Sequence, residues 1–291
     1  MFSQYFGQYL LNRGIVAGEV LLKALEAQQQ SHVKLGVLAV GAGLLTAAQV
    51  EEIHREQTRQ DKKFGEIAME KGYLTQAQLE ELLASQKQGH LQLGQALIDA
   101  GALTFEQLEK ALQDYQKEYS FSDKEFASVQ EGNVELLLAR TLQLDPGEEY
   151  LNSYIYLFAR NLVRFVDPHA WLEPVDGGSK DRLAGAWSVE QQIEGEFALK
   201  TGITGSEQGF CKLASAFAGE KIEAMGELGQ ASVAEFLNLH NGIFLVNMSN
   251  LGMELKLQPP VVKEGALGWQ GDHRAFKVNF PGGQFALLLQ G

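Results

Sequence analysis

The first 118 residues carry a repeat of 29 residues that occurs four times. Each copy contains two glycines seven positions apart, and an apolar residue precedes the first of them. The pairs are Gly7 and Gly14, Gly36 and Gly43, Gly65 and Gly72, and Gly94 and Gly101. A fixed period in this range is typical of helical units that stack on one another, so it restricts the fold more than composition does. The first proline is Pro146, which agrees with helices throughout this stretch.

Local signals predict where the helices of each copy begin and end. The second glycine is expected to end a helix, because glycine adopts the left-handed conformation of a helix C-terminus without steric cost. Two apolar residues follow it, and then a threonine and a glutamine three positions apart form a capping box that begins the next helix. These boxes are Thr46 with Gln49, Thr75 with Gln78, and Thr104 with Gln107. Each copy is therefore predicted to contain a short helix, a tight turn and a longer helix.

Two of these copies resemble a known family. Residues 34–57 and 63–86, joined by five residues, are similar to the MshEN domain, the N-terminal domain of type II secretion ATPases. Because that family pairs two such blocks, the resemblance implies two tandem helical domains, over residues 1–58 and 59–118. The sequence has no Gly-x-x-x-x-Gly-Lys-Ser/Thr loop, so the chain is not predicted to be the ATPase itself.

The same resemblance implies a nucleotide site at the start of each block. Some members of that family bind cyclic di-GMP, and an arginine that heads an Arg-Leu-Gly triplet grips the guanine. The matching triplets here are Lys34, Leu35 and Gly36, and Lys63, Phe64 and Gly65. A lysine cannot make the planar, bidentate contact of an arginine. The sequence therefore favours a helical module that docks other signalling proteins, with a cyclic di-GMP receptor as the alternative.

Residues 119–291 have a different pattern from the repeat. Residues 119–148 lose the 29-residue phase and are predicted to be a connecting helical segment. Residues 149–291 alternate between helical and strand-like periodicity. Helices are expected over 149–166, 206–218 and 226–250, and strands around 196–200, 253–257, 276–280 and 285–289. The predicted fold is therefore multi-domain, with all-α helical repeats followed by an α+β domain whose helices pack on a β-sheet.

Composition excludes several kinds of function. The 291 residues carry a net charge of −13, so nucleic acids and anionic lipid surfaces are not expected as partners. The six histidines and the single cysteine show no ligand spacing, so neither a metal site nor a disulfide is predicted. No signal peptide is visible at the start of the sequence, and no apolar run reaches the roughly 18 residues that span a bilayer. We expect a cytoplasmic protein without membrane insertion.

One helix carries the residues that are suited to chemistry. Over residues 231–252, one side is apolar and is expected to face the core. Glu235 and Asn238 are three residues apart on the opposite side, so their side chains project together. The amide can orient a water molecule, and the carboxylate can pair with a lysine of a partner. Small neighbours would let that partner approach closely, and the whole face holds Ala231, Glu235, Asn238, Gly242 and Ser249.

The same helix carries a second resemblance, which covers about residues 149–291. The matching string is similar to the CheC/CheX/FliY family of chemotaxis phosphatases and comprises Glu235, Asn238, Gly242, Leu251, Gly252 and Pro260. In that family the glutamate anchors a lysine of a phosphorylated response regulator such as CheY, and the asparagine orients the water that hydrolyses its aspartyl phosphate. The resemblance implies these roles for Glu235 and Asn238. It also implies that this chain binds no cofactor, because the regulator supplies its own Mg²⁺.

The sequence leaves alternatives open. Ala231 stands where the family often has aspartate or serine, and Ala234 replaces its usual glycine. A non-catalytic adaptor with the same partner surface is therefore one alternative, and a signalling protein that responds to cyclic di-GMP is another. A second Glu-x-x-Asn pair, Glu149 with Asn152, is expected to mark the start of a helix. The resemblance also allows a homodimer formed through sheet edges.

Overall fold

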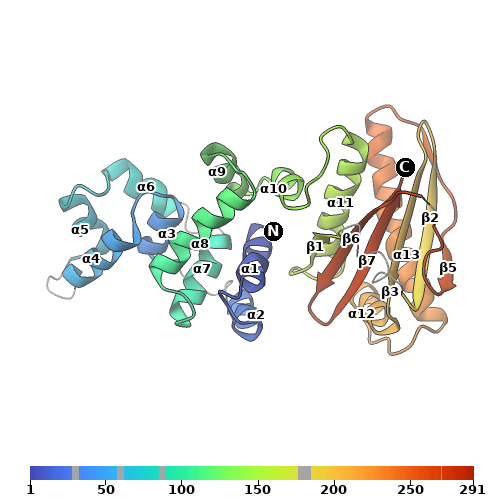
Figure 1. Cartoon of the computed structure of the whole chain (residues 1–291), viewed down its shortest axis with the longest axis horizontal. Coiled ribbons are helices and arrows are strands. Elements are labelled where there is room, and N and C mark those ends of the chain that lie inside the picture. The colour runs from blue at the N-terminus through green and yellow to red at the C-terminus, as the bar shows by residue number, and fades with distance from the viewer. Residues whose placement is uncertain (28–32, 58–61, 85–88, 176–184, 270) are drawn as a thin grey trace. The chain divides into compact units, whose positions relative to one another are not determined.

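The chain folds into two units, each with its own set of internal contacts. The computed structural model describes residues 1–27, 33–57, 62–84, 89–175, 185–269 and 271–291. Contacts between Cα atoms assign Met1–Arg140 to the first unit and Thr141–Gly291 to the second. Among the described residues, the first unit is helical, and the second combines helices with an antiparallel sheet (Figure 1). The predicted fold class, all-α repeats followed by an α+β domain, is confirmed.

The first eight helices form four pairs, one pair for each copy of the repeat. Two further helices occupy the segment that was expected to connect the two halves. The helices are α1 (Phe2–Asn12), α2 (Gly18–Ala27), α3 (Leu35–Gly41), α4 (Ala47–Gln57), α5 (Phe64–Glu70), α6 (Gln76–Ala84), α7 (Gly89–Asp99), α8 (Phe105–Glu118), α9 (Asp123–Glu131) and α10 (Val134–Thr141).

The turn inside each pair has the predicted geometry. The second glycine of each copy has a positive φ, between +65° at Gly43 and +71° at Gly72. The capping boxes also form, and in the fourth copy the Thr104 amide donates to Gln107 Oε1 at 2.8 Å while the Gln107 amide donates to Thr104 Oγ1 at 3.1 Å. The same reciprocal pair of bonds begins α4 and α6. Both local signals are therefore confirmed.

The first glycine of each copy occurs where a larger residue would clash with a neighbouring helix, which the sequence did not reveal. Each lies against the side chain fourteen positions later, in the second helix of its own pair. A Cβ added at the glycine would approach that side chain to between 2.9 and 3.1 Å, for Gly7 with Leu21, Gly36 with Val50, Gly65 with Leu79, and Gly94 with Leu108. Ordinary van der Waals contact is wider, so the repeat preserves the close approach of two helices.

Packing in the first unit also crosses between copies. Helices α1 and α2 contact α7, and α3 contacts both α7 and α8. The buried ring of Tyr115 on α8 is surrounded by aromatic side chains, with centroid distances between 4.7 and 6.4 Å, from Phe2, Phe6, Tyr9, Tyr119, Phe121 and Phe126. The finer division into domains at residues 1–58 and 59–118 stays a prediction.

In the described part of the second unit, three helices accompany one sheet. Its elements are α11 (Glu149–Phe165), β1 (Trp171–Pro174), β2 (Trp187–Gly195), β3 (Leu199–Gly205), α12 (Glu207–Ala218), α13 (Glu227–Asn250), β4 (Leu255–Leu257), β5 (Val261–Glu264), β6 (Arg274–Phe280) and β7 (Gly283–Gln290). The strand order is β1-β6-β7-β3-β2-β4, and β5 pairs with β2 beside β4. The three predicted helices are confirmed, and Gly219 and Gly252 follow α12 and α13 with positive φ, as expected.

Three features of the sheet differ from the prediction. Strand β1 was not expected from the sequence. The strand expected around Phe197 begins only at Leu199, because residues 196–198 belong to the turn between β2 and β3. Strand β2 was not predicted at all. Its inward-facing residues include Gln191, which interrupts the apolar alternation that marks a half-buried strand.

The register of β2 and β3 decides which residues meet the helices. Gln191 lies opposite Thr201 in this antiparallel pair, and both side chains point toward α13. On the other face of the sheet, Trp269 lies close to Gly202 and donates to Glu190 at 2.8 Å. Burial alone would raise the pKa of Glu190, but hydrogen bonds from Lys263, Trp269 and Lys200 outweigh it and lower that pKa to about 2.

None of the described helices is both long and apolar enough to cross a membrane.

The close contact at the first glycine predicts a specific stability defect. Gly36→Ala places a methyl group 2.9 Å from the stiff Val50 side chain. Overpacking costs about 1–3 kcal/mol, which exceeds the roughly 0.5–1 kcal/mol gained by replacing glycine inside a helix. We expect Gly36→Ala to lower the midpoint of thermal unfolding of the first unit, measured by circular dichroism on the full chain.

Two variants control this experiment. Gly18→Ala adds a methyl group whose nearest side chain lies at an ordinary 3.7 Å, so its midpoint should stay level or rise. Adding Val50→Ala to Gly36→Ala should cost less than the sum of the two single changes, because the clash is then removed. Strict additivity would refute the steric explanation.

Candidate functional site

Helix α13 presents the face that the sequence singled out to solvent. Ala231, Glu235 and Ser249 are exposed, and Asn238 and Gly242 are partly exposed. A Cβ added at Gly242 would point into open space. The opposite side is buried, as predicted, through Val233, Leu237, His240, Phe244 and Met248. The structure therefore brings the carboxylate and the amide together on an accessible ridge.

The two polar side chains of this ridge contact each other. Asn238 Nδ2 donates to Glu235 Oε2 at 3.2 Å. On its inner side, Asn238 Oδ1 accepts a hydrogen bond of 2.9 Å from Gln191 Nε2 on β2. Asn238 is thus held from the sheet below and from Glu235 one helical turn away.

Gln191 joins three parts of the second unit. Its Nε2 also donates to the backbone carbonyl of Gln258 at 2.8 Å, and its Oε1 accepts from Asn241 Nδ2 at 2.9 Å. The side chain is only 2% exposed. Because Gln258 lies between β4 and β5, this contact fixes the edge segment that carries Pro259 and Pro260 next to α13.

Asn241 continues the same hydrogen-bonded cluster into the core. Its Nδ2 also donates to Thr201 Oγ1 at 2.9 Å, and its Oδ1 accepts from the Tyr154 hydroxyl at 2.7 Å. Burial raises the pKa of Tyr154, so its hydroxyl keeps the proton that it donates. Sequence reasoning missed Gln191 and Asn241. The available signals were a glutamine that breaks a strand pattern and an asparagine on the apolar side of a helix.

His240 lies beside this cluster as a neutral core residue. It is fully buried, its Nδ1 lies 3.0 Å from Asn161 Nδ2, and its ring packs edge-on against Tyr154 and Phe158. Burial lowers the pKa of His240 to about 3, so the imidazole carries no charge near neutral pH. It supplies no positive charge behind Asn238.

Apolar side chains extend the accessible face of α13. Leu228 is 53% exposed near its start, Val246 is 60% exposed in its last turns, and Leu251 directly after it is 68% exposed. These side chains are exposed singly along the helix, which is ordinary for a protein surface.

The second Glu-x-x-Asn pair is arranged differently. Glu149 is exposed at the start of α11, but Asn152 is only 7% exposed, and its Nδ2 donates to the Asp145 carbonyl at 2.7 Å. This asparagine therefore fixes the segment that precedes α11. The two side chains do not form an outward pair like Glu235 and Asn238.

The triplets of the first unit are engaged by the chain itself. Lys34 Nζ pairs with Asp99 Oδ1 at 2.8 Å, and the Lys34 amide donates to the buried Gln95 Oε1 at 3.0 Å. The Lys63 amide donates to Glu66 Oε2 at 2.9 Å, which places a carboxylate at the start of α5.

Neither glycine of the triplets faces an open cradle. Atoms of Val50, Phe105 and Phe64 surround the position of a Cβ at Gly36. Leu79 and Leu35 do the same at Gly65. Leu35 and Phe64 are therefore part of the helix packing around these glycines.

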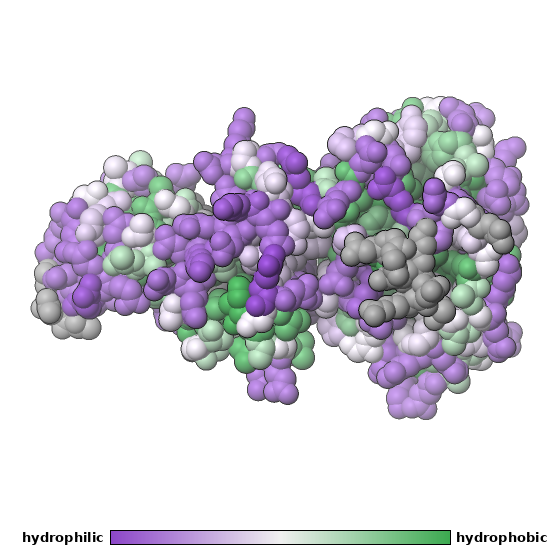
Figure 2. Space-filling view, viewed as in Figure 1, coloured by the Kyte–Doolittle hydropathy of each residue, from purple (hydrophilic) through white to green (hydrophobic). Residues whose placement is uncertain are grey.

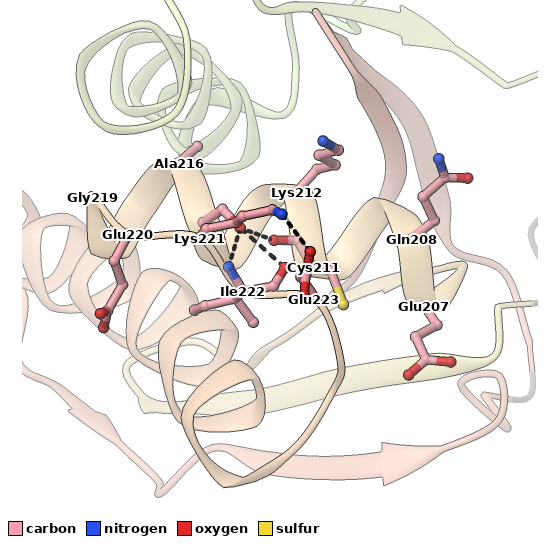
Figure 3. Close-up of a pocket in the computed structure, with 11 residues that line it drawn as sticks. Glu207, Gln208, Cys211, Lys212, Ala216, Gly219, Glu220, Lys221, Ile222 and Glu223 are labelled. Atoms are coloured by element: carbon pink, nitrogen blue, oxygen red, sulfur yellow. Dashed lines mark hydrogen bonds and ion pairs between the residues drawn. The ribbon is translucent and has the colours of Figure 1, made fainter.

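A hollow of about 800 Å³ lies beside α12, and several of its polar groups are bonded within the chain. Ser215 Oγ donates to the Cys211 carbonyl at 2.7 Å and accepts from the Ile222 amide at 2.9 Å, while Lys221 pairs with Glu223 (Figure 3). Burial, with Glu207 nearby, raises the pKa of the Cys211 thiol, which disfavours a reactive thiolate. Among the described residues, no group of three or more histidine, cysteine and acidic side chains could hold a metal ion.

Comparisons with known proteins find likeness only at the level of structure. No protein-family model matches this chain, and no curated protein matches its sequence. Two solved structures of chemotaxis protein CheX are similar to it. The protein from Desulfovibrio desulfuricans has 17% sequence identity over 49% of this chain and 98% of that chain, with a TM-score of 0.39. The protein from Vibrio vulnificus has 18% identity over 48% of this chain and 97% of that chain, with a TM-score of 0.41.

A chain of the CheX–CheY–BeF₃–Mg²⁺ complex from Borrelia burgdorferi is also similar, with 15% identity over 48% of this chain and 95% of that chain and a TM-score of 0.40. Identities and scores of this size do not indicate which side chains act. The candidate functional residues are therefore those of α13 and their hydrogen-bond partners.

The engaged triplets predict the outcome of a ligand titration. Calorimetry of the full chain with cyclic di-GMP should give no binding heat at high micromolar ligand. The expected reason is that Asp99 neutralises Lys34 and that Glu66 repels a phosphate at α5. Binding heat that disappears in Lys34→Ala would contradict this expectation and favour the nucleotide-receptor alternative.

Proposed function

We propose that the second unit binds a phosphorylated receiver domain through the accessible face of α13 and hydrolyses its aspartyl phosphate. The observation that carries this proposal is the exposed Glu235–Asn238 pair, whose amide is held by Gln191 from below. Added to this is the resemblance of the short string Glu235-x-x-Asn238-x-x-x-Gly242 to the CheC/CheX/FliY phosphatases.

The chemistry requires a water molecule placed in line with the bond that breaks. Water attacks the phosphorus atom, the bond from phosphorus to the aspartyl oxygen breaks, and the products are a free carboxylate, inorganic phosphate and a proton. Asn238 would orient this water through its side-chain amide, which lowers the entropic part of the barrier. A divalent cation held by the receiver would neutralise the phosphoryl oxygens, as the resemblance implies.

Glu235 would fix the position of the receiver. Its exposed carboxylate can accept from a lysine ammonium, and a charge-assisted bond of this kind is stronger than the bond it now accepts from Asn238. On binding, Glu235 would therefore exchange one donor for another. Ala231, Gly242 and Ser249 would permit close approach, and Val246 and Leu251 would provide apolar contact.

For the first unit, we propose a docking role for other signalling proteins. Figure 2 shows a largely hydrophilic face with an apolar area around α2. Ile15 and Leu22 are 37% and 45% exposed there. An apolar area of this kind suits contact with another protein.

A non-catalytic adaptor is the second candidate function. It would use the same face of α13 for binding, and Ala231 and Ala234 at the departures from the family pattern favour it. The two candidate functions differ in whether the receiver's phosphate is hydrolysed, but both place the receiver on the same face of α13. An experiment must therefore measure phosphate loss and affinity separately.

The proposal predicts that one amide carries the turnover. The full chain should accelerate release of inorganic phosphate from a phosphorylated CheY-like receiver, and Asn238→Ala should lower this rate about 100-fold because the water is no longer oriented. Asn247→Ala, an exposed asparagine on another side of the same helix, should leave the rate unchanged. Phosphate release can be followed with a coupled colorimetric assay.

Affinity for a beryllofluoride-loaded receiver separates the two candidates. Glu235→Ala should weaken binding by about tenfold, whereas Glu149→Ala at the start of α11 should not. A wild-type chain that binds at α13 but leaves the phosphate lifetime unchanged would replace the phosphatase with the adaptor. A chain with neither activity would refute both.

A further inference from the structure

We propose that Gln191, held by Asn241, is a positioning residue that sets the direction in which Asn238 presents its amide. This inference rests on the proposed function. Neither residue lies on the accessible face, since Gln191 is 2% exposed and Asn241 is fully buried. Both would act through Asn238.

The three hydrogen bonds of Gln191 permit only one orientation of its amide. Nε2 faces two acceptors, Asn238 Oδ1 at 2.9 Å and the Gln258 carbonyl at 2.8 Å, and Oε1 faces the Asn241 donor at 2.9 Å. Turning the side-chain amide by 180° would place Oε1 against the Gln258 carbonyl and Nε2 against a donor. A backbone carbonyl can only accept, so this contact is decisive.

A second backbone carbonyl fixes the orientation of Asn241. The Thr201 hydroxyl donates to the Gln191 carbonyl at 3.0 Å, so its oxygen must accept the 2.9 Å bond from Asn241 Nδ2. The Tyr154 hydroxyl then donates to Asn241 Oδ1 at 2.7 Å on the other side. Two carbonyls, of Gln191 and Gln258, therefore determine the direction of every amide in the cluster.

The consequence reaches the surface at Asn238. Since Gln191 can only donate to it, the Asn238 oxygen is held inward and sideways, and its Nδ2 is directed to Glu235 at 3.2 Å. The Nδ2 group points outward, so its N–H groups would hold the water once the receiver has drawn Glu235 away. The Asn238 amide is preorganised, so it does not have to rotate when the receiver binds.

The closing experiment compares Gln191→Met with the wild-type chain. Methionine keeps an unbranched side chain of similar length but cannot donate to Asn238. With a saturating phosphorylated receiver, we expect the single-turnover rate of phosphate loss to fall about tenfold or more. The affinity for the beryllofluoride-loaded receiver should stay within about twofold, because Glu235 and the apolar face are intact.

A spectroscopic readout and a matched control accompany the rates. In Gln191→Met, the side-chain amide NMR signals of Asn238 should shift from their wild-type positions, and their protons should exchange faster with solvent. Ser215→Ala removes a hydrogen bond from α12 of the same unit, so it controls for a general loss of stability. Its turnover and its Asn238 signals should equal those of the wild type.

The outcomes distinguish this inference from the function on which it rests. A wild-type chain without phosphatase activity overturns both. If the wild type is active and Gln191→Met is equally active, the positioning role alone is overturned. The same holds if Gln191→Met loses affinity and turnover in equal proportion. If Gln191→Met does not fold, Gln191→Leu carries the same expectation, since leucine is an apolar side chain of similar size that cannot donate to Asn238.

Discussion

The second unit depends on one buried polar joint between its sheet and its longest helix. Gln191 on β2 bonds to Asn238 and Asn241 on α13 and to the Gln258 carbonyl at the sheet edge. A buried amide left without partners costs about 1–3 kcal/mol, so this joint strongly favours a single register between α13 and β2. A slip by one residue would turn Gln191 to the other face of the sheet. The accessible pair of Glu235 and Asn238 therefore owes its position to an interaction that lies beneath it.

The first unit depends on a constraint of a different kind. Its repeated glycines keep the two helices of each pair in close contact, at separations that a methyl group would violate. The constraint is steric, and it acts within each copy. The resulting helices expose an apolar area around α2. In the triplets that a nucleotide receptor would use, Lys34 forms an ion pair, the Lys63 amide is capped by Glu66, and both glycines are closely packed.

The parts of this structure that could be predicted from the sequence are set by local interactions. Gly43 and Gly72 end their helices, and Thr104 begins one, because the partners of each lie within a few residues. The outward position of Glu235 and Asn238 follows from helical periodicity alone.

Other parts depend on contacts that are distant in the sequence. Gln191 meets Asn241 across 50 positions and Gln258 across 67, so no local pattern marks them as partners. Strand β2 escaped prediction for the same reason, since its buried glutamine looks like a surface residue until its partners are known. The strand expected at Phe197 was placed too early because a tight turn can also alternate apolar and polar residues.

The accessible face of α13 is the proposed binding site of a receiver domain. The most direct test is to titrate a beryllofluoride-loaded receiver into the full chain and follow side-chain amide signals by NMR. We predict that the signals of Asn238 move or broaden as the receiver is added, while those of the buried Asn152 and Asn161 stay in place. Saturating receiver that leaves Asn238 unchanged, or that perturbs only residues away from α13, would contradict the account.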